Sequence, residues 1–251
     1  MNAVIGIDYG TKSARAILVD AATGDVLKSI SVKYPRGILT NDTVCVDDYT
    51  ETLDELLREV AMPEYRESVR GICVDATSLT LVCLTKEGVP LEKVCGFEET
   101  EHAKVKLWKR HTAKAQAEEA LTLAKSLDEP FLQGSCGTIS AEWTLPKLLE
   151  MRDEAPKVYA RADIAFDLCE YLTYLLTGRL VRTIGSMCYK GLWSKKNGFP
   201  SDNYLDTLRE GFAKEYKHLL RGEVLTAGSA AGTLLPSICP SSATPQSPSI
   251  L

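Results

Sequence analysis

Two short apolar segments near the start of the chain, Ala3 to Ile7 and Arg15 to Val19, are separated by only a few mostly polar residues. This spacing predicts two antiparallel strands joined by a tight hairpin tip. Gly10 in the tip permits a positive φ and a close approach of the backbone to an anion. The neighbouring amides can form an anion-binding concavity, to which Thr11 and Ser13 add hydroxyl donors. The chain therefore opens with a hairpin whose tip could hold a phosphate.

Asp8 ends the first predicted strand, next to the tip. A carboxylate at this position can hold a hard cation such as Mg²⁺ through water while the cation bridges phosphate oxygens. Plain turn chemistry is the opposing interpretation, because Asp, Gly, Thr and Ser are favoured in turns for conformational reasons alone. The chain contains neither GxxxxGK[ST] nor a GxGxxG after a strand, so two common nucleotide-binding fingerprints are absent. The hairpin needs support from other motifs before it indicates phosphate binding.

Composition excludes several classes of protein. The 251 residues are 45% hydrophobic and 25% charged with a net charge of -5, which is typical of a globular protein and does not favour binding to nucleic acid or anionic lipid. No apolar run reaches the roughly 18 residues of a membrane span and no secretory signal pattern opens the chain, so we expect a cytoplasmic protein.

The cysteines form no CxxC pair and the histidines no HExxH, which argues against structural zinc. We expect cysteines in apolar runs, such as Cys73 and Cys83, to be reduced core residues.

Strand and helix patterns alternate in the first third of the chain. Strands are predicted at Ala3 to Ile7, Arg15 to Val19, Val26 to Val32, Val69 to Val74 and Leu79 to Thr85. The strand that begins at Val69 is almost continuously apolar, which predicts a central strand covered on both faces. A helix is predicted within residues 47–60, because Asp48 and Glu51 form a capping-box pattern and leucines recur at helical spacing after them.

The pattern from Glu101 onward is mainly helical. Helices are predicted at Thr112 to Lys125, Glu142 to Arg152 and Asp167 to Leu176, the last of them ended by Gly178. Residues 237–251 then change abruptly to Ser and Pro without any period, which predicts a disordered or aberrant tail. Residues 1–236 are therefore expected to form one layered α/β domain with a helical elaboration.

Several ordered motifs, together with the hairpin, resemble the amino-terminal domain of the FGGY family of carbohydrate kinases, and within it most closely the ribulokinase branch. The motifs are VDATSLTLVCLTKEGVPL (74–91), LWKRHTA (107–113), SAEWTLPKLL (140–149), FDLCEYLTYLLTG (166–178) and CYKGLW (188–193). The resemblance implies an α/β fold of the actin, Hsp70 and hexokinase type (ribonuclease H-like) with a mixed sheet. It implies ATP and Mg²⁺ as cofactors, L-ribulose as the sugar in arabinose catabolism, and allows a homodimer.

Two alternatives to an L-ribulose kinase stay open. The chain could be a kinase for another polyol or ketose, such as xylulose, D-ribulose or glycerol. It could instead be a sugar-binding or regulatory module without catalysis. Calorimetry with sugar and with ATP distinguishes such a module from one half of an enzyme, because a working module binds sugar alone at useful affinity.

The resemblance assigns a role to individual positions on the phosphate side. Asp8 would be the acid associated with Mg²⁺ through water. The residues that would surround the transferring phosphate are Gly10, Thr11, Lys12, Ser13 and Arg15.

The resemblance also assigns the sugar side. Ala76, Thr77 and Ser78 would line the sugar pocket, and Trp108 would form an aromatic wall beside it. Glu142 would either bind sugar hydroxyls or close a helix whose N-cap is Ser140. Lys190 would be a catalytic residue over the substrate, where its charge stabilises a phosphoryl or ketose oxygen.

The sequence departs from the family in three places, one of which is a shorter stretch between Tyr34 and Asp48. Arg110 stands where relatives usually carry an acid that accepts bonds from sugar hydroxyls, so we expect a different substrate or a weaker affinity. After Pro236 the family continues into a second domain that holds the general base, whereas this chain continues with SICPSSATPQSPSIL. We therefore expect the second domain to be absent and the isolated chain not to turn over.

Overall fold

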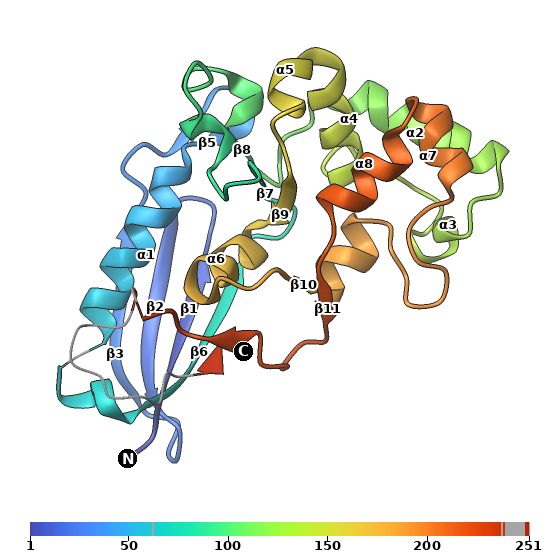
Figure 1. Cartoon of the computed structure of the whole chain (residues 1–251). Coiled ribbons are helices and arrows are strands. Elements are labelled where there is room, and N and C mark those ends of the chain that lie inside the picture. The colour runs from blue at the N-terminus through green and yellow to red at the C-terminus, as the bar shows by residue number, and fades with distance from the viewer. Residues whose placement is uncertain (62, 237, 239–248, 251) are drawn as a thin grey trace.

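The computed structural model describes residues 1–61, 63–236, 238 and 249–250 (Figure 1). The strands are β1 (Ala3–Tyr9), β2 (Ser13–Asp20), β3 (Val26–Lys33), β4 (Ile38–Leu39), β5 (Thr43–Val44), β6 (Val69–Ala76), β7 (Leu81–Leu84), β8 (Val105–Lys106), β9 (Ile164–Asp167), β10 (Val181–Thr183), β11 (Glu223–Leu225), β12 (Gly232–Thr233) and β13 (Ser249–Ile250). The helices are α1 (Val46–Val60), α2 (Lys114–Ser126), α3 (Phe131–Gly134), α4 (Thr144–Glu154), α5 (Pro156–Tyr159), α6 (Leu168–Thr177), α7 (Asp202–Leu208) and α8 (Phe212–Leu219).

The largest sheet has the strand order β12-β13-β6-β1-β2-β3. Strands β1, β2 and β3 form the predicted antiparallel meander, and β6 returns parallel to β1, so the sheet is mixed. Alternate side chains of β1 are buried from Ala3 to Tyr9, as expected for a strand with one face on the core. The parallel pairing places the carboxyl ends of β1 and β6 side by side at the edge that carries the hairpin tip.

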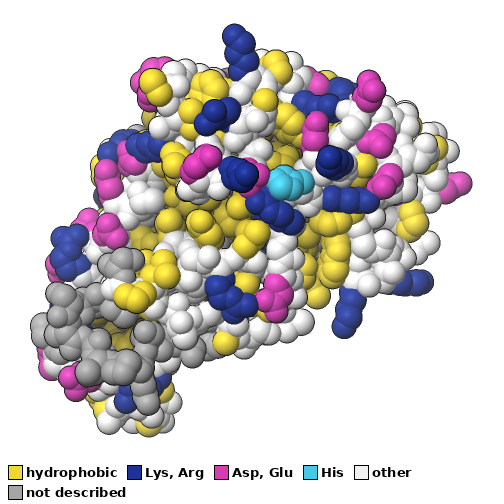
Figure 2. Space-filling view, in the orientation of Figure 1, with side chains coloured by type: hydrophobic (Ala, Val, Ile, Leu, Met, Phe, Trp, Pro, Cys, Tyr) yellow, Lys and Arg dark blue, Asp and Glu magenta, His cyan; other side chains and the backbone are white. Residues whose placement is uncertain are grey.

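Helices α1 and α6 cover one face of this sheet. Buried leucines of both helices belong to the same hydrophobic cluster as the inward residues of β1, β2 and β6. A second cluster fills the other lobe, where α2, α4, α7 and α8 pack together. Figure 1 shows the two lobes side by side, and on the face seen in Figure 2 hydrophobic side chains gather along their junction.

The opposite face of the large sheet differs from the expectation for β6. We expected this strand to be covered on both faces, but Arg70, Cys73 and Asp75 are exposed on it. The interpretation of Cys73 as a core thiol is therefore wrong, whereas Cys83 on β7 is buried as expected. Within the described residues, α1 and α6 both lie on the other side, which leaves these positions in contact with solvent.

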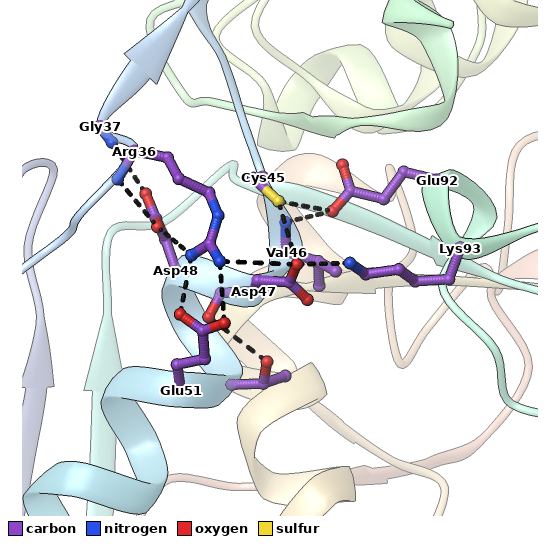
Figure 3. A network of polar contacts seen from close by, with 10 residues as sticks. Arg36, Gly37, Cys45, Val46, Asp47, Asp48, Glu51, Glu92 and Lys93 are labelled. Atoms are coloured by element: carbon purple, nitrogen blue, oxygen red, sulfur yellow. Dashed lines mark hydrogen bonds and ion pairs between the residues drawn. The ribbon is translucent and has the colours of Figure 1, made fainter. Parts of the chain in front are cut away.

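The amino-terminal end of α1 is held by residues from other elements, and not by a capping box (Figure 3). The helix begins at Val46, whose amide donates to the carboxylate of Glu92. Asp48 is fully buried and accepts bonds from the amides of Arg36 (3.2 Å) and Gly37 (2.9 Å). The guanidinium of Arg36 also binds Asp48 (3.0 Å) and Glu51 (2.8 Å). The predicted capping role of Asp48 and Glu51 is therefore wrong, because both carboxylates bind the loop before β4.

Replacement of Asp48 by Asn should destabilise the fold. The substitution removes the charge that Arg36 faces and replaces one acceptor oxygen with a donor opposite two backbone amides, a change that costs about 2 to 4 kcal/mol of unfolding free energy. Urea unfolding measures this loss, and Asp54→Asn is the matched control because Asp54 is exposed on the same helix. Equal unfolding free energies for the two variants would contradict the assignment.

Only part of the predicted tail belongs to the described residues. Ser249 and Ile250 form β13, which pairs parallel with β6, so the expectation of a disordered tail does not hold at these two residues. Ser237, residues 239–248 and Leu251 lie outside the described residues. None of the helices that the structure describes has the length and apolarity needed to cross a membrane.

Candidate functional site

The hairpin tip is closed and supported by its own backbone and by tyrosines. The amide of Gly10 donates to the carbonyl of Ser13 (2.9 Å), and Tyr34 donates from its hydroxyl to the carbonyl of Gly10 (2.9 Å). The prediction of a positive φ at Gly10 is wrong, since this glycine is not among the residues with positive φ. Glycine is favoured there for space, because a Cβ would lie 3.1 Å from the carbonyl oxygen of Ser13.

The tip presents donors without internal partners. Within the described part of the chain, the structure provides no acceptor for the amides of Thr11 and Lys12 or for the hydroxyl of Ser13. The ammonium of Lys12 is exposed and forms no ion pair with a described residue. Successive free amides with a nearby cation make a concavity suited to an anion. Phosphate binding at this tip stays a prediction.

Three charged residues form a row across the strands beside the tip. Asp8 on β1 pairs in register with Arg15 on β2 and with Asp75 on β6. The carboxylate of Asp8 lies 2.7 Å from the guanidinium of Arg15, and the side chains of Asp8 and Arg15 are 47% and 65% exposed. An exposed pair of this kind contributes only about 0 to 1 kcal/mol, so the two groups can separate readily to bind ligands.

The oxygen donors of this row fit a magnesium ion. Mg²⁺ prefers carboxylate oxygens and water, and it usually takes only one or two carboxylates from the protein. Across the described residues no cluster of three or more His, Cys, Asp or Glu side chains is arranged for a metal. A magnesium ion here would therefore be held by Asp8, with Asp75 alongside, through water and the phosphates of a nucleotide.

Trp108 connects the tip with the loop that follows β8. Its indole Nε1–H donates to the hydroxyl of Thr11 at 3.1 Å, and the ring is 37% exposed. The predicted aromatic wall of the sugar site and the predicted phosphate site are therefore in direct contact, although 97 residues separate them in the sequence.

The turn after β6 lies beside the same strand end. The amide of Thr77 donates to the carbonyl of Tyr9 (2.8 Å), and the hydroxyls of Thr77 and Thr80 share a bond of 3.1 Å. Ser78 is exposed and Ala76 is half-buried. Strand β7 begins at Leu81, two residues later than predicted, because Leu79 takes a left-handed backbone conformation with φ 68°.

Lys190 is buried in an ion pair that sequence reasoning did not identify. Its ammonium lies 3.0 Å from Asp167, and the exposed fractions of the two side chains are 10% and 8%. Asp167 is the N-cap of α6, as predicted from its position, and it forms a capping box with Glu170. The same Asp167 oxygen accepts the amide of Leu79 at 2.8 Å. The lysine is thus fixed against the turn that carries the other predicted sugar residues.

Glu142 pairs with a histidine. Its carboxylate lies 3.2 Å from Nε2 of His111, in the loop that also carries Trp108. Helix α4 begins at Thr144 with Trp143 as its N-cap, so the prediction of Ser140 as N-cap is wrong. Glu142 precedes this helix, and its carboxylate faces the Trp108 loop and makes no capping contact there.

The terminal nitrogens of Arg110 are bound by other parts of the chain. Its side chain is buried and binds the carbonyl of Asn41 (2.8 Å), Glu101 (2.8 Å) and Glu150 (3.3 Å). The different substrate or weaker affinity expected from this arginine stays a prediction. Arg110 holds the Trp108 loop against α4.

Two cavities lie among the described residues, and neither is a closed sugar pocket. One has about 10 Å³ beside Asp167 and Ser186, which is room for roughly one water. Another, of about 130 Å³, lies between Phe131 and Phe199, away from the hairpin. The partly exposed side chains of Asp8 and Trp108 contribute to the surface of the candidate site.

Lys147 is a further buried lysine near this surface, and the sequence analysis did not single it out. Its ammonium donates to the carbonyls of Leu79 (2.7 Å) and Leu107 (2.8 Å). Burial, together with the charges of Lys106 and Arg110, lowers its pKa to about 7 against the opposing effect of Asp167 and Glu142. A charged residue inside the apolar run LPKLL is the signal that could have identified it.

The depressed pKa of Lys147 predicts a stability that rises with pH. Between pH 7 and 8.5 the unfolded chain keeps this proton while the folded chain releases it, so unfolding becomes less favourable as pH rises. The unfolding free energy of the wild type relative to Lys147→Met should increase by about 1 to 2 kcal/mol over this window. Urea titrations at the two pH values measure it, and a constant difference would contradict the pKa.

Solved structures share this fold. A ligand-bound xylulose kinase from Lactobacillus acidophilus superposes with a TM-score of 0.75 at 16% identity, covering 95% of this chain and 45% of that one. A glycerol kinase from Plasmodium falciparum with ADP gives 0.76 at 11% identity, covering 100% and 47%. The mixed sheet with its helices is therefore the amino-terminal fold of sugar kinases, of the actin and hexokinase type.

The chain belongs to the FGGY family of carbohydrate kinases, because the model of that family's N-terminal domain matches residues 3–193. Ribulokinases from Halalkalibacterium halodurans and Mycolicibacterium smegmatis are 32% and 33% identical to it, each over 92% of this chain. The chain spans 44% of the length of these curated relatives.

Proposed function

We propose that the chain is the sugar- and phosphate-binding part of an ATP-dependent kinase that phosphorylates a ketopentose, with L-ribulose as the first candidate. The contact between Trp108 and Thr11 carries this proposal, because it joins an aromatic wall to the phosphate-binding tip. The two reactants of a phosphoryl transfer must meet at such a junction. The similarity to curated ribulokinases supports L-ribulose over xylulose, D-ribulose or glycerol.

Catalysis in this site would be mostly positioning and charge stabilisation. The amides of Thr11 and Lys12, with Ser13 and Arg15, would hold the terminal phosphate of ATP. Magnesium bound near Asp8 would neutralise charge on the phosphate oxygens when it is present.

The sugar side would orient the acceptor hydroxyl. Trp108 would pack against the apolar face of the sugar while Glu142 accepts bonds from its hydroxyls. Lys190, held by Asp167, would place a positive charge near the reacting oxygens. The general base would come from the part of the relatives that this chain does not match. The homodimer and the cytoplasmic location stay predictions.

A kinase assay over a panel of sugars tests the proposal. Residues 1–236 are fused to the carboxyl-terminal remainder of the Halalkalibacterium halodurans ribulokinase, and the remainder alone is the control. We expect phosphorylation of L-ribulose at a higher kcat/KM than of D-ribulose, xylulose or glycerol. A folded fusion that phosphorylates no sugar of the panel above the control would refute the proposed function.

A further inference from the structure

Leu79 is a strained residue on the sugar side, and both polar groups of its backbone are fixed. Its φ of 68° is uncommon for any residue other than glycine, and such a conformation persists only where the surroundings enforce it. The amide donates to Asp167 at 2.8 Å, and the carbonyl accepts from the ammonium of Lys147 at 2.7 Å. The turn of residues 77–80 is therefore held from two helices at once, because Asp167 caps α6 and Lys147 lies on α4.

Lys147 makes a second bond that reaches the Trp108 loop. Its Nζ lies 2.8 Å from the carbonyl of Leu107, the residue before Trp108. One amino group thus joins the turn after β6 to the loop that contacts the phosphate-binding tip through Thr11. The amide of Leu79 joins the same turn to Asp167, and through Asp167 to Lys190.

The chemistry of Lys147 excludes direct contact with a substrate. The residue is only 1% exposed, and its two bonds are to backbone carbonyls. Burial lowers its pKa to about 7, and a neutral amine still has two N–H donors, which match the two carbonyl acceptors. Either protonation state can therefore maintain both contacts.

We propose that Lys147 is a positioning residue of the sugar site, which fixes the 77–80 turn and the Trp108 loop in one geometry. This inference rests on the proposed function, since it deepens the account of the same site. The expected consequence is that loss of the amine disturbs Leu79 and Trp108 together and weakens sugar binding.

Lys106 provides a matched control. It is also 1% exposed, and burial lowers its pKa as well. Its Nζ donates to the carbonyl of His102 at 2.6 Å and contacts the sulfur of Met151, and neither residue belongs to the candidate site. Any loss of stability that follows from removing a buried lysine in general should therefore appear in both Lys106→Met and Lys147→Met.

The experiment uses ¹H–¹⁵N spectra of the 251-residue chain. The indole resonance of Trp108 is assigned with Trp108→Phe, and the Leu79 amide with selective leucine labelling and Leu79→Met. We expect Lys147→Met to shift the Trp108 indole and to speed hydrogen exchange at the Leu79 amide by about tenfold or more. Lys106→Met, two residues before Trp108, should change both signals clearly less. Lys147→Gln, which retains two N–H donors, should move both signals less than Lys147→Met does, and it replaces Lys147→Met if that variant does not fold.

Titration with L-ribulose completes the test. The apparent Kd read from the Trp108 indole should rise about tenfold in Lys147→Met, which corresponds to roughly 1.4 kcal/mol, and stay within about twofold in Lys106→Met. Unchanged Leu79 and Trp108 signals in Lys147→Met, or equal changes in the two variants, would overturn the positioning role. A fused kinase that phosphorylates no sugar of the panel would instead count against the proposed function. If the 251-residue chain alone does not respond to L-ribulose, as a kinase half can behave, the exchange data still decide the link between the two loops.

Discussion

Asp8→Asn should lower kcat of the fused kinase by about 10²- to 10³-fold, the loss typical when a charge-stabilising element of a phosphoryl transfer is removed. The substitution keeps the shape of the side chain and removes the charge that would hold magnesium. The Mg²⁺ concentration for half-maximal activity should rise at the same time. Steady-state assays over a magnesium series at saturating L-ribulose measure both quantities.

The fold should tolerate this substitution. The pair of Asp8 with Arg15 is exposed, so its loss costs at most about 1 kcal/mol of unfolding free energy. Asp25→Asn is the matched control, because Asp25 lies in the exposed turn between β2 and β3. If Asp8→Asn keeps a near-normal kcat and an unchanged magnesium dependence, Asp8 is not the metal-associated acid.

Lys190→Met should lower kcat by a similar factor of about 10² to 10³, because a positive charge close to the reacting oxygens is lost. This variant also leaves Asp167 buried without its partner, which destabilises a fold by about 3 to 5 kcal/mol. The two effects must be separated. Lys195→Met, an exposed change a few residues further along the chain, is the control for the region.

The double variant Lys190→Met with Asp167→Asn separates stability from catalysis. Replacing the carboxylate by an amide removes the unpaired buried charge, so the unfolding free energy should recover in part. The activity should stay low if Lys190 acts on the substrate. Recovery of kcat together with stability would show that the lysine only neutralises Asp167.

The parts of the fold that depend on local sequence were predicted correctly. The first hairpin follows from two apolar segments around a mostly polar tip, and its strands pair antiparallel as predicted. Helix α6 begins after Asp167 and ends at Gly178, whose φ of 68° explains why a glycine stands there. In both cases the residues that determine the element lie within it or next to it.

Two of the incorrect predictions, the starts of α1 and of β7, concern ends of elements whose partners come from elsewhere in the chain. Helix α1 begins where Glu92 meets the amide of Val46, a contact across 46 residues that no local capping pattern reveals. The start of β7 is set by the left-handed Leu79, which Asp167 and Lys147 hold from other elements. Arg110 was interpreted from its alignment with an acid, and its burial among two glutamates could not be read from the motif.

The candidate site was predicted from resemblance more than from local pattern. The sequence motifs identify Asp8, Trp108 and Lys190, but only the structure shows that Trp108 contacts the hairpin and that Lys190 is paired. Lys147 and Asp167 contribute through hydrogen bonds to one turn. Long-range bonds of this kind produce no pattern of residue spacing that could be recognised in the sequence.

The most direct measurement is a crystal structure of the fused kinase with an ATP analogue that cannot be hydrolysed and with Mn²⁺ in place of Mg²⁺. Anomalous scattering locates the metal independently of the interpretation of the site. We predict Mn²⁺ beside the Asp8 carboxylate with ordered water between them, and the terminal phosphate on the amides of Thr11 and Lys12. Metal and phosphates bound elsewhere, with Asp8 still paired to Arg15, would contradict the account.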